Sequence, residues 1–197
     1  MRSAVSAESL DQILRSARTY NGWTDTPVEE RAVHDLYDIL KWGPTSANSS
    51  PARFVWIRSA EGKAKLAGLA WEKNRPKILA APLTVIIGND LDFADAMPKL
   101  MPHNAEAMQK AFAQPGMSEI TAMRNGSLQG AYLIIAARAL GLDCGPMSGF
   151  DNAGVDRVFF AGTRIQSNFI CNIGYGNPDS VFPRNPRLTF EEAGQWA

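Results

Sequence analysis

The longest helical pattern in this 197-residue chain runs from 118 to 140, and it limits the folds open to the sequence. Gly141 follows it as the type of residue that ends helices in a left-handed conformation. Four apolar residues recur on one face of this helix: Leu128, Ala131, Ile135 and Ala139. Four small residues would let another helix approach closely: Gly126, Gly130, Ala136 and Ala137. We therefore predict a central packing helix that could also form a seam between subunits.

Short apolar runs elsewhere predict a few strands separated by helices. The predicted strands are 54–57, 83–87, the interrupted run 142–150, and 168–176. Four of the five residues at 83–87 are apolar, with Thr84 the exception, as is typical of a strand covered on both faces. Further helices are predicted at 6–16, from 26 to about 40, at 61–69, and from Asp151. No linker, repeat or low-complexity tract divides the sequence, so we expect one domain of mixed α/β type.

Capping residues indicate where several of these helices begin. Ser6 is the expected N-cap of the first helix, and Thr26–Glu29 reads as a capping box with proline at the first helical position. The second helix should bury one stripe: Ala32, Val33, Leu36, Ile39 and Leu40. Thr189–Glu192 forms another capping box near the end of the chain. The pattern from 89 to 116 is weak and rich in proline and methionine, which is more typical of a mobile cover than of a core.

Composition excludes several classes of function. Lys and Arg together number 20, as do Asp and Glu, so no net charge favours nucleic acid or an anionic membrane. No apolar run approaches the ~20 residues of a membrane span, and the N-terminus lacks the apolar region of a signal peptide. Cys144 and Cys171 fit no disulfide framework, so we predict buried free thiols in a cytoplasmic protein. His34 is expected at the surface, and His103 has no second ligand at metal spacing, so no metal is predicted.

A polar loop from Trp42 to Arg53 is the stretch with the most chemistry. It contains Gly and Pro, which a turn needs, together with four hydroxyl side chains, an amide and an arginine, which a turn does not need. Neutral donors and acceptors at such density suit a polar heterocycle with carbonyls and ring nitrogens. Turn chemistry alone would also give this composition, so both interpretations stay open at this point.

Arginines gather at both ends of the chain. Arg15 and Arg18 lie close to Ser16 and could cradle an anion, although the same residues suit a solvated helix end. Arg184 and Arg187 lie in a tail stiffened by two prolines, which favours an extended path that could clamp a dianion. The Gly174-x-Gly176 pair does not begin a dinucleotide fingerprint, because an aspartate occupies the place of the third glycine.

Together these segments resemble the FMN-dependent nitroreductase family from about Ser6 to Ala193. The landmarks occur in the family order. They are Arg15-Ser16-x-Arg18, Pro44-Thr45-Ser46-x-Asn48, Asn74-x-x-Lys77, the run Gly141–Asp151, and a strand ending Ile173-Gly174-Tyr175 before a basic tail. Within the family, 42–48 and 145–151 look like the malonic semialdehyde reductase branch, which serves pyrimidine degradation.

The resemblance implies an α+β sandwich in which helices wrap a central, mainly antiparallel sheet. It also implies a single domain over 1–197, with a C-terminal arm from about 182, in an intertwined homodimer with FMN at the subunit interface. Arg15, Ser16 and Arg18 would hold the phosphate, the ribityl chain and the pyrimidine edge of FMN. Arg184 and Arg187 would grip the phosphate. The other implied contacts are Asn74 and Lys77 at the polar ring edge, Pro146, Met147, Ser148 and Gly149 along the ring, and Pro44, Thr45, Ser46 and Asn48 from the other subunit.

The implied activity is hydride transfer from NADH or NADPH through the flavin N5 to a small acceptor. Because the flavin carries the chemistry, no side chain is assigned as catalytic. Arg18 and Lys77 are the candidates to stabilise the negative charge of the reduced ring. The branch resemblance implies malonic semialdehyde, reduced to 3-hydroxypropionate, as the acceptor. The alternatives are a broad nitroaromatic or quinone reductase and a non-enzymatic flavin-binding module.

Two positions depart from the family pattern. Ser148 stands where many members carry an acidic residue, so the contact with the ring edge could differ here. Leu14 replaces the basic residue that is common before Arg15. The phosphate would therefore depend more on Arg184 and Arg187.

Overall fold

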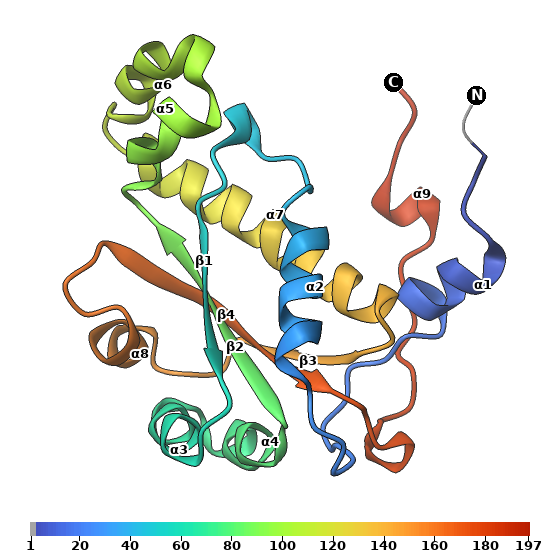
Figure 1. Cartoon of the computed structure of the whole chain (residues 1–197). Coiled ribbons are helices and arrows are strands. Elements are labelled where there is room, and N and C mark those ends of the chain that lie inside the picture. The colour runs from blue at the N-terminus through green and yellow to red at the C-terminus, as the bar shows by residue number, and fades with distance from the viewer. Residues whose placement is uncertain (1–2) are drawn as a thin grey trace.

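The structure is a computed structural model that describes residues 3–197. Four strands form one sheet in the order β1-β2-β4-β3, and all three neighbouring pairs are antiparallel (Figure 1). The strands are β1 (Ala52–Ile57), β2 (Leu83–Asp90), β3 (Asp143–Met147) and β4 (Ile165–Gly174). Seven of the eight β2 residues are buried, as the apolar run predicted. The order makes β3 an edge strand, which is important for the site.

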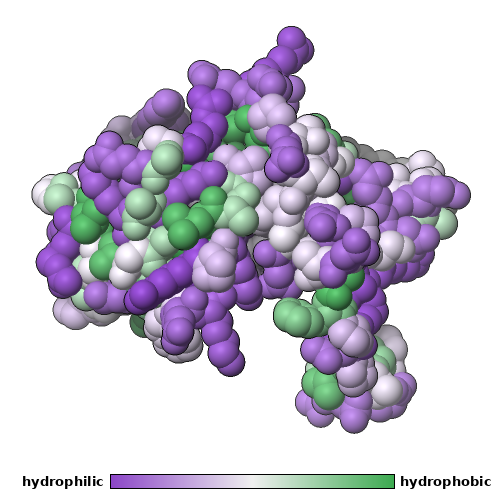
Figure 2. Space-filling model, turned by 90° about the horizontal axis from the view of Figure 1, so that it is seen from below, coloured by the Kyte–Doolittle hydropathy of each residue, from purple (hydrophilic) through white to green (hydrophobic). Residues whose placement is uncertain are grey.

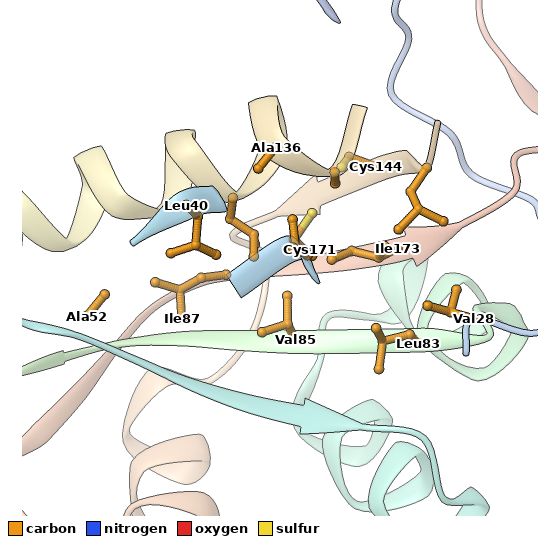
Figure 3. Close-up of a cluster of buried hydrophobic side chains, with 14 residues drawn as sticks. Val28, Leu40, Ala52, Leu83, Val85, Ile87, Ala136, Cys144, Cys171 and Ile173 are labelled. Atoms are coloured by element: carbon orange, nitrogen blue, oxygen red, sulfur yellow. The ribbon is translucent and has the colours of Figure 1, made fainter. Parts of the chain in front are cut away.

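One face of the sheet is covered by α2 (Glu30–Leu40) and α7 (Met117–Ala139). Figure 3 shows Leu40 and Ala136 above the side chains of Val85 and Ile87 on the central strand β2. Cys144 and Cys171 lie in this core as fully buried free thiols, which confirms the predicted burial of the two thiols. The remaining buried members are Val28, Leu36, Ala52, Leu83, Leu133, Ala137, Leu142 and Ile173.

The opposite face is covered by α3 (Ala60–Leu69), α4 (Arg75–Ala80) and α8 (Asn152–Phe159). Ser59 and Asp151 cap α3 and α8, each by accepting a hydrogen bond from the backbone N–H three residues later. The core between these helices and the sheet contains Ile57, Leu66, Ala67, Ala70, Ile78, Ile86, Phe150, Val155, Phe160 and Ile170. Seen from below Figure 1, the outer surface is mainly hydrophilic with scattered hydrophobic side chains (Figure 2).

The long helix α7 is the central packing helix that the sequence predicted, but its two faces are used differently from the prediction. Gly126 and Gly130 face the sheet rather than another helix, because an added Cβ would lie 2.0 Å from Asn89 Oδ1 at the first and 2.4 Å from the Phe169 ring at the second. The predicted apolar face points outward, with Leu128 41% and Ile135 40% exposed. An unpaired apolar stripe therefore runs along the outside of α7.

The first helices begin differently from each other. Ser6 caps α1 (Ala7–Leu10) as predicted, and a π-helical turn continues it over Asp11–Arg15. The predicted capping box at Thr26–Glu29 is wrong, because α2 begins only at Glu30 and has no side-chain cap. Val28 is buried in the core instead. It occupies the position before the cap of α2, where an apolar residue can fix the entry of the chain.

The stripe predicted for the second helix is only partly correct. Leu36 and Leu40 are buried, and Ala32 and Val33 pack against the same core. Ile39, however, is 45% exposed, because it lies on the outer side of the last turn. His34 is exposed, as expected.

The segment from 89 to 116, which was expected to be a cover rather than part of a core, is partly core. It contains short helical turns and a core of its own, where the Phe93 and Phe112 rings meet edge to face at 4.9 Å. Leu91 and Met97 complete this cluster together with Ala122, which belongs to α7. The elements are α5 (Met97–Leu100), α6 (Ala105–Phe112) and the 3₁₀ turns Phe93–Ala96 and Pro102–Asn104.

The N-terminal and C-terminal segments lie side by side next to the C-terminal end of α7 (Figure 1). The C-terminal segment has the predicted capping box, with Thr189 as the cap of α9 (Phe190–Ala193). The other short elements are the 3₁₀ turns Ser46–Asn48, Glu72–Asn74 and Pro178–Ser180. Within residues 3–197, no helix combines the length and the apolar character that a bilayer crossing requires.

Candidate functional site

A cleft of about 610 Å³ opens where the segments around 14–21 and 182–187 meet the end of α7. Five arginines line it: Arg15, Arg18, Arg138, Arg184 and Arg187. No aspartate or glutamate is among the described residues that line it. Within the described part of the chain, the one ion pair recorded for these arginines joins exposed Arg15 to Asp11 at 3.5 Å. A cluster of guanidinium groups with so little ionic compensation suits an anion of more than one negative charge.

Arginines also hold the two chain ends together around this cleft. Arg18 donates a hydrogen bond to the carbonyl oxygen of Phe182. In the reverse direction, Arg184 Nη2 donates to the carbonyl oxygen of Ala17 at 2.9 Å. Because these acceptors are neutral carbonyls, the guanidinium groups keep their full charge and still have N–H groups available for a ligand.

Arg138 belongs to this cluster, and the sequence analysis missed it. It lies in the last turn of α7, where its Nη1 and Nη2 donate to the carbonyls of Ile13 at 3.1 Å and Arg18 at 3.5 Å. Its Nε is buried and has no hydrogen-bond partner among residues 3–197. A basic residue at a helix C-terminus is ordinary in any helix, so its sequence position carried no signal of a site.

A second group of predicted residues gathers near the end of β3. Asn74 Nδ2 donates to the carbonyl oxygen of Gly149 at 3.1 Å, and the Trp71 backbone N–H donates to the same oxygen at 2.9 Å. A Cβ on Gly149 would lie 2.7 Å from Asn74 Nδ2, so glycine is needed for this close approach. The Lys77 carbonyl accepts a hydrogen bond from Asn172 at 2.9 Å, and Asn172 pairs with Gly145 in the sheet.

The two groups are connected along the edge strand. Thr19 forms a parallel bridge with Cys144, and the Tyr20 N–H donates to the Cys144 carbonyl at 3.1 Å. Arg18 therefore directly precedes Thr19, the residue that pairs with β3. β3 ends at Met147, two residues before Gly149. Burial raises the pKa of Tyr20, and the Asp143 carboxylate adds to this while Arg18 opposes it. The phenol is thus neutral at physiological pH.

The remaining predicted positions on and around β3 differ in their access. Met147 packs partly into the core beneath α3, α4 and α8. Pro146 is half-buried, while Ser148 is exposed at the end of the strand. Ser16 is exposed next to the cleft but is not among the residues that line it.

The loop at 44–48 does not join these groups within one chain. It lies beside the middle of α7, where Tyr132 Oη donates to the Pro44 carbonyl at 2.8 Å. The residues that line the arginine cleft do not include Thr45, Ser46 or Asn48. The structure thus brings together the arginines around the cleft, and Asn74 and Lys77 near β3, while it places this loop elsewhere.

The conformation of this loop was not apparent from the sequence. Ala47 and Asn48 both have φ values of 51°, and Ser50 has a φ of 41°. None of them is glycine, so the loop holds three residues in a left-handed region that is costly for side chains. The Ser49 hydroxyl is fully buried and finds no hydrogen-bond partner in the described part of the chain. Such local strain is common at functional sites, where the surrounding structure maintains it.

Comparison with known proteins identifies the class. The family model described as "Nitroreductase family" matches residues 2–175, and the chain belongs to this family. Membership confirms the predicted enzyme class, a flavin-dependent oxidoreductase. The α+β architecture with an antiparallel sheet is confirmed as well.

Curated relatives are similar in sequence to this chain over 95% or more of its length. A protein of Caulobacter sp. (strain K31) is 58% identical over 187 residues, which cover 95% of each chain. A protein of Xanthomonas oryzae pv. oryzae (strain PXO99A) is 55% identical over 196 residues, covering all of both chains. Both carry the provisional name NADH dehydrogenase/NAD(P)H nitroreductase.

Solved structures share the fold at much lower sequence identity. A provisionally named nitroreductase from Exiguobacterium sibiricum 255-15, solved in complex with FMN, superimposes with a TM-score of 0.86 at 21% identity, covering 100% of this chain and 99% of that one. A nitroreductase family protein from Streptococcus pneumoniae TIGR4 gives a TM-score of 0.83 at 21% identity, covering 96% of this chain and 98% of that one.

Proposed function

We propose that this protein is an FMN-dependent oxidoreductase that takes hydride from NADH or NADPH and passes it to a small acceptor. The observation that carries the proposal is the cleft lined by five arginines and no carboxylate, joined through β3 to the polar groups at Asn74 and Lys77. Family membership supports the flavin, and the names of the relatives support the nicotinamide donor.

The residues present fit FMN at both of its ends. The phosphate of FMN is a dianion, and Arg15, Arg18, Arg184 and Arg187 line one cleft where it would bind. The unpartnered Nε of Arg138 is a further donor whose burial calls for an acceptor. Gly149 has no room for a Cβ because the Asn74 and Trp71 side chains pack against it, and this close packing holds the Asn74 amide at the end of β3, where the polar edge of the ring would lie.

The chemistry assigns distinct tasks to these residues. When bound, FMN accepts and donates hydride at N5. Arg18 and Lys77 would supply positive charge near the polar edge of the bound ring, since fixed cations in a site cost no reorganisation during the reaction. Asn74 is held by the Gly149 carbonyl, so its amide is oriented before any ligand binds. Arg184 and Arg187 would bind the phosphate of FMN and would take no part in the hydride transfer.

The proposal includes a homodimer in which the loop at 44–48 completes the FMN site of the partner subunit. Three features support it: the loop lies away from the cleft of its own chain, the outer stripe of α7 is apolar, and Phe182, Leu188 and Trp196 of the C-terminal segment are exposed. We keep the single domain with a C-terminal arm from about 182 as part of this proposal. The buried free thiols support a cytoplasmic location.

For the acceptor we propose malonic semialdehyde, reduced to 3-hydroxypropionate in pyrimidine degradation. The motifs at 42–48 and 145–151 support this choice. The names of the relatives favour a second candidate, a broader reductase of nitroaromatics.

The decisive experiment has two steps. Denaturation of the purified protein should release a yellow chromophore with the mass of FMN. A panel of acceptors, with malonic semialdehyde against nitroaromatics and quinones, should then be run with NADH and with NADPH. Protein that is colourless and takes up no added FMN would refute the proposed function. A higher kcat/KM for nitroaromatics than for malonic semialdehyde would select the second candidate acceptor.

A further inference from the structure

Three polar side chains of α7 bind the backbone of the loop that precedes β1. Asn125 Oδ1 accepts a hydrogen bond from the Ser46 N–H at 2.8 Å, and Gln129 Oε1 accepts one from the Ala52 N–H at 2.8 Å. Tyr132 Oη donates to the Pro44 carbonyl at 2.8 Å. The three positions are spaced by four and three residues, so they share one face of the helix. They hold the loop at its start, its middle and its end.

Burial makes two of these contacts strong. Asn125 is 2% exposed and Gln129 is 6% exposed. An amide buried to this degree is costly unless it is hydrogen-bonded, and the Asn125 Nδ2 satisfies its own need by donating to the Thr121 carbonyl at 2.9 Å. The side-chain oxygen of each amide accepts its hydrogen bond from the backbone of the loop. These polar residues therefore interrupt the apolar face of the central helix in order to bind one segment.

The loop needs such support because its backbone is strained. Left-handed conformations at Ala47, Asn48 and Ser50 are unfavourable for residues with a Cβ, and no local glycine relieves them. The Thr45 hydroxyl, which accepts from the Ser50 N–H at 3.1 Å, adds one local bond. Within the loop, the Asn48 and Ser49 N–H groups also donate to the Thr45 and Ser46 carbonyls at 3.0 Å. These local bonds shape the turn, whereas the bonds from α7 fix the loop in place against the helix.

We propose that Asn125 and Gln129 are positioning residues for the flavin site. They fix the strained form of the loop, so that its hydroxyl and amide side chains are presented in one geometry to FMN bound in the partner subunit. This inference rests on the proposed function, because it takes the loop as an FMN contact. Neither residue touches the cleft of its own chain.

Matched substitutions separate the hydrogen bond from the bulk of the side chain. Asn125→Asp and Gln129→Glu keep an oxygen for the loop N–H, whereas Asn125→Leu and Gln129→Met keep the approximate volume and remove the acceptor. We expect the latter two to speed hydrogen exchange at the Ser46 and Ala52 amides, respectively. We also expect each to raise the Kd for FMN by about tenfold, since a buried N–H left without its acceptor is costly.

The kinetic signature distinguishes positioning from general weakening of the fold. With FMN saturating, the acceptor-removing variants should show a lower kcat for flavin reduction, and the acceptor-keeping variants should recover it. Ile134→Val is the control, because Ile134 packs against the same core from α7 and its side chain makes no recorded bond to the loop in the described chain. It should lower stability while leaving the FMN Kd and both amide exchange rates unchanged.

Residues 125 and 129 are tested independently. If Asn125→Leu does not fold, Gln129→Met still tests the inference, and the reverse also holds. Unchanged FMN affinity and kcat in a folded acceptor-removing variant would overturn the inference. So would equal losses in the Ile134→Val control. If the unmodified protein binds no FMN, the proposed function fails and this inference with it. If the unmodified protein binds FMN and the variants behave like it, only the positioning role fails.

Discussion

Replacing Arg187 by alanine should weaken FMN binding without slowing the transfer of hydride. In the structure its guanidinium lines the cleft, and Nη1 donates to the Asn185 and Pro186 carbonyls at 3.0 and 3.1 Å. These local bonds orient the side chain before a ligand binds. A competing role in an ion pair is not seen in residues 3–197, since no ion pair of Arg187 is recorded and the Glu192 carboxylate instead accepts from the Thr189 N–H at 2.8 Å.

The size of the effect follows from the exposure of this side chain. A hydrogen bond to a charged group contributes about 1.5–3 kcal/mol, and an exposed pair falls at or below the lower end of that range. Arg187 is exposed, so we expect the Kd of FMN to rise by about tenfold, at about 1.4 kcal/mol per decade. Four other arginines remain in the cleft, which prevents complete loss of binding.

The assay is titration of the apo-protein with FMN, followed by flavin fluorescence. Arg187→Lys should retain part of the affinity, because it keeps the charge but not the planar donor fork. Arg157→Ala, an exposed arginine on α8, is the control for loss of one surface charge and should leave the Kd unchanged. An unchanged Kd in Arg187→Ala, or an equal change in the Arg157 control, would refute the reasoning. A large drop in flavin reduction at saturating FMN would also contradict it.

Three further predictions concern packing, titration and assembly. Gly130→Ala should lower the free energy of unfolding by about 1–3 kcal/mol in urea denaturation, because the added Cβ overlaps the aromatic ring that faces it. Gly68→Ala should instead stabilise slightly, since nothing lies within 4 Å of the added Cβ. A hydrogen bond with Cys144, together with burial, raises the pKa of the Cys171 thiol. The unfolded thiol therefore ionises first, and stability should fall as the pH rises above about 8.5, with a weaker slope in Cys171→Ala. Ile135→Glu should shift sedimentation toward the monomer, because it charges the exposed stripe of α7.

Each of these predictions has its own control or contrary outcome. Gly68→Ala serves as the control for Gly130→Ala, and equal losses at both sites would contradict the packing argument. Rapid alkylation of the native thiols at pH 8 would contradict their burial. Val158→Glu places the same charge on the exposed side of α8, where it should leave the oligomeric state unchanged. A dimer that survives Ile135→Glu unchanged would exclude the α7 stripe as the interface.

The sequence predicted most of the elements because their signals are local. The strand at 83–87 is mostly apolar, the helix at 118–140 ends at Gly141, and Thr189 forms a capping box with Glu192, so each signal depends on neighbouring residues alone. Periodicity does not say which apolar face meets the core. Leu128 and Ile135 look like core residues in the sequence, yet the sheet packs against Gly126 and Gly130 on the other side.

The sequence also marked the arginines at both ends of the chain, since Arg15, Arg18, Arg184 and Arg187 stand out by type and spacing. Only the tertiary structure decided that they share one cleft, because roughly the whole length of the chain separates them and no local pattern encodes such a contact. The same applies to Arg138, an ordinary helix-end residue until the two chain ends fold beside it. The strained loop depends on Asn125 and Gln129, which a sequence shows as polar interruptions of a helix, and which gain a role only when folding buries their amides against the loop backbone.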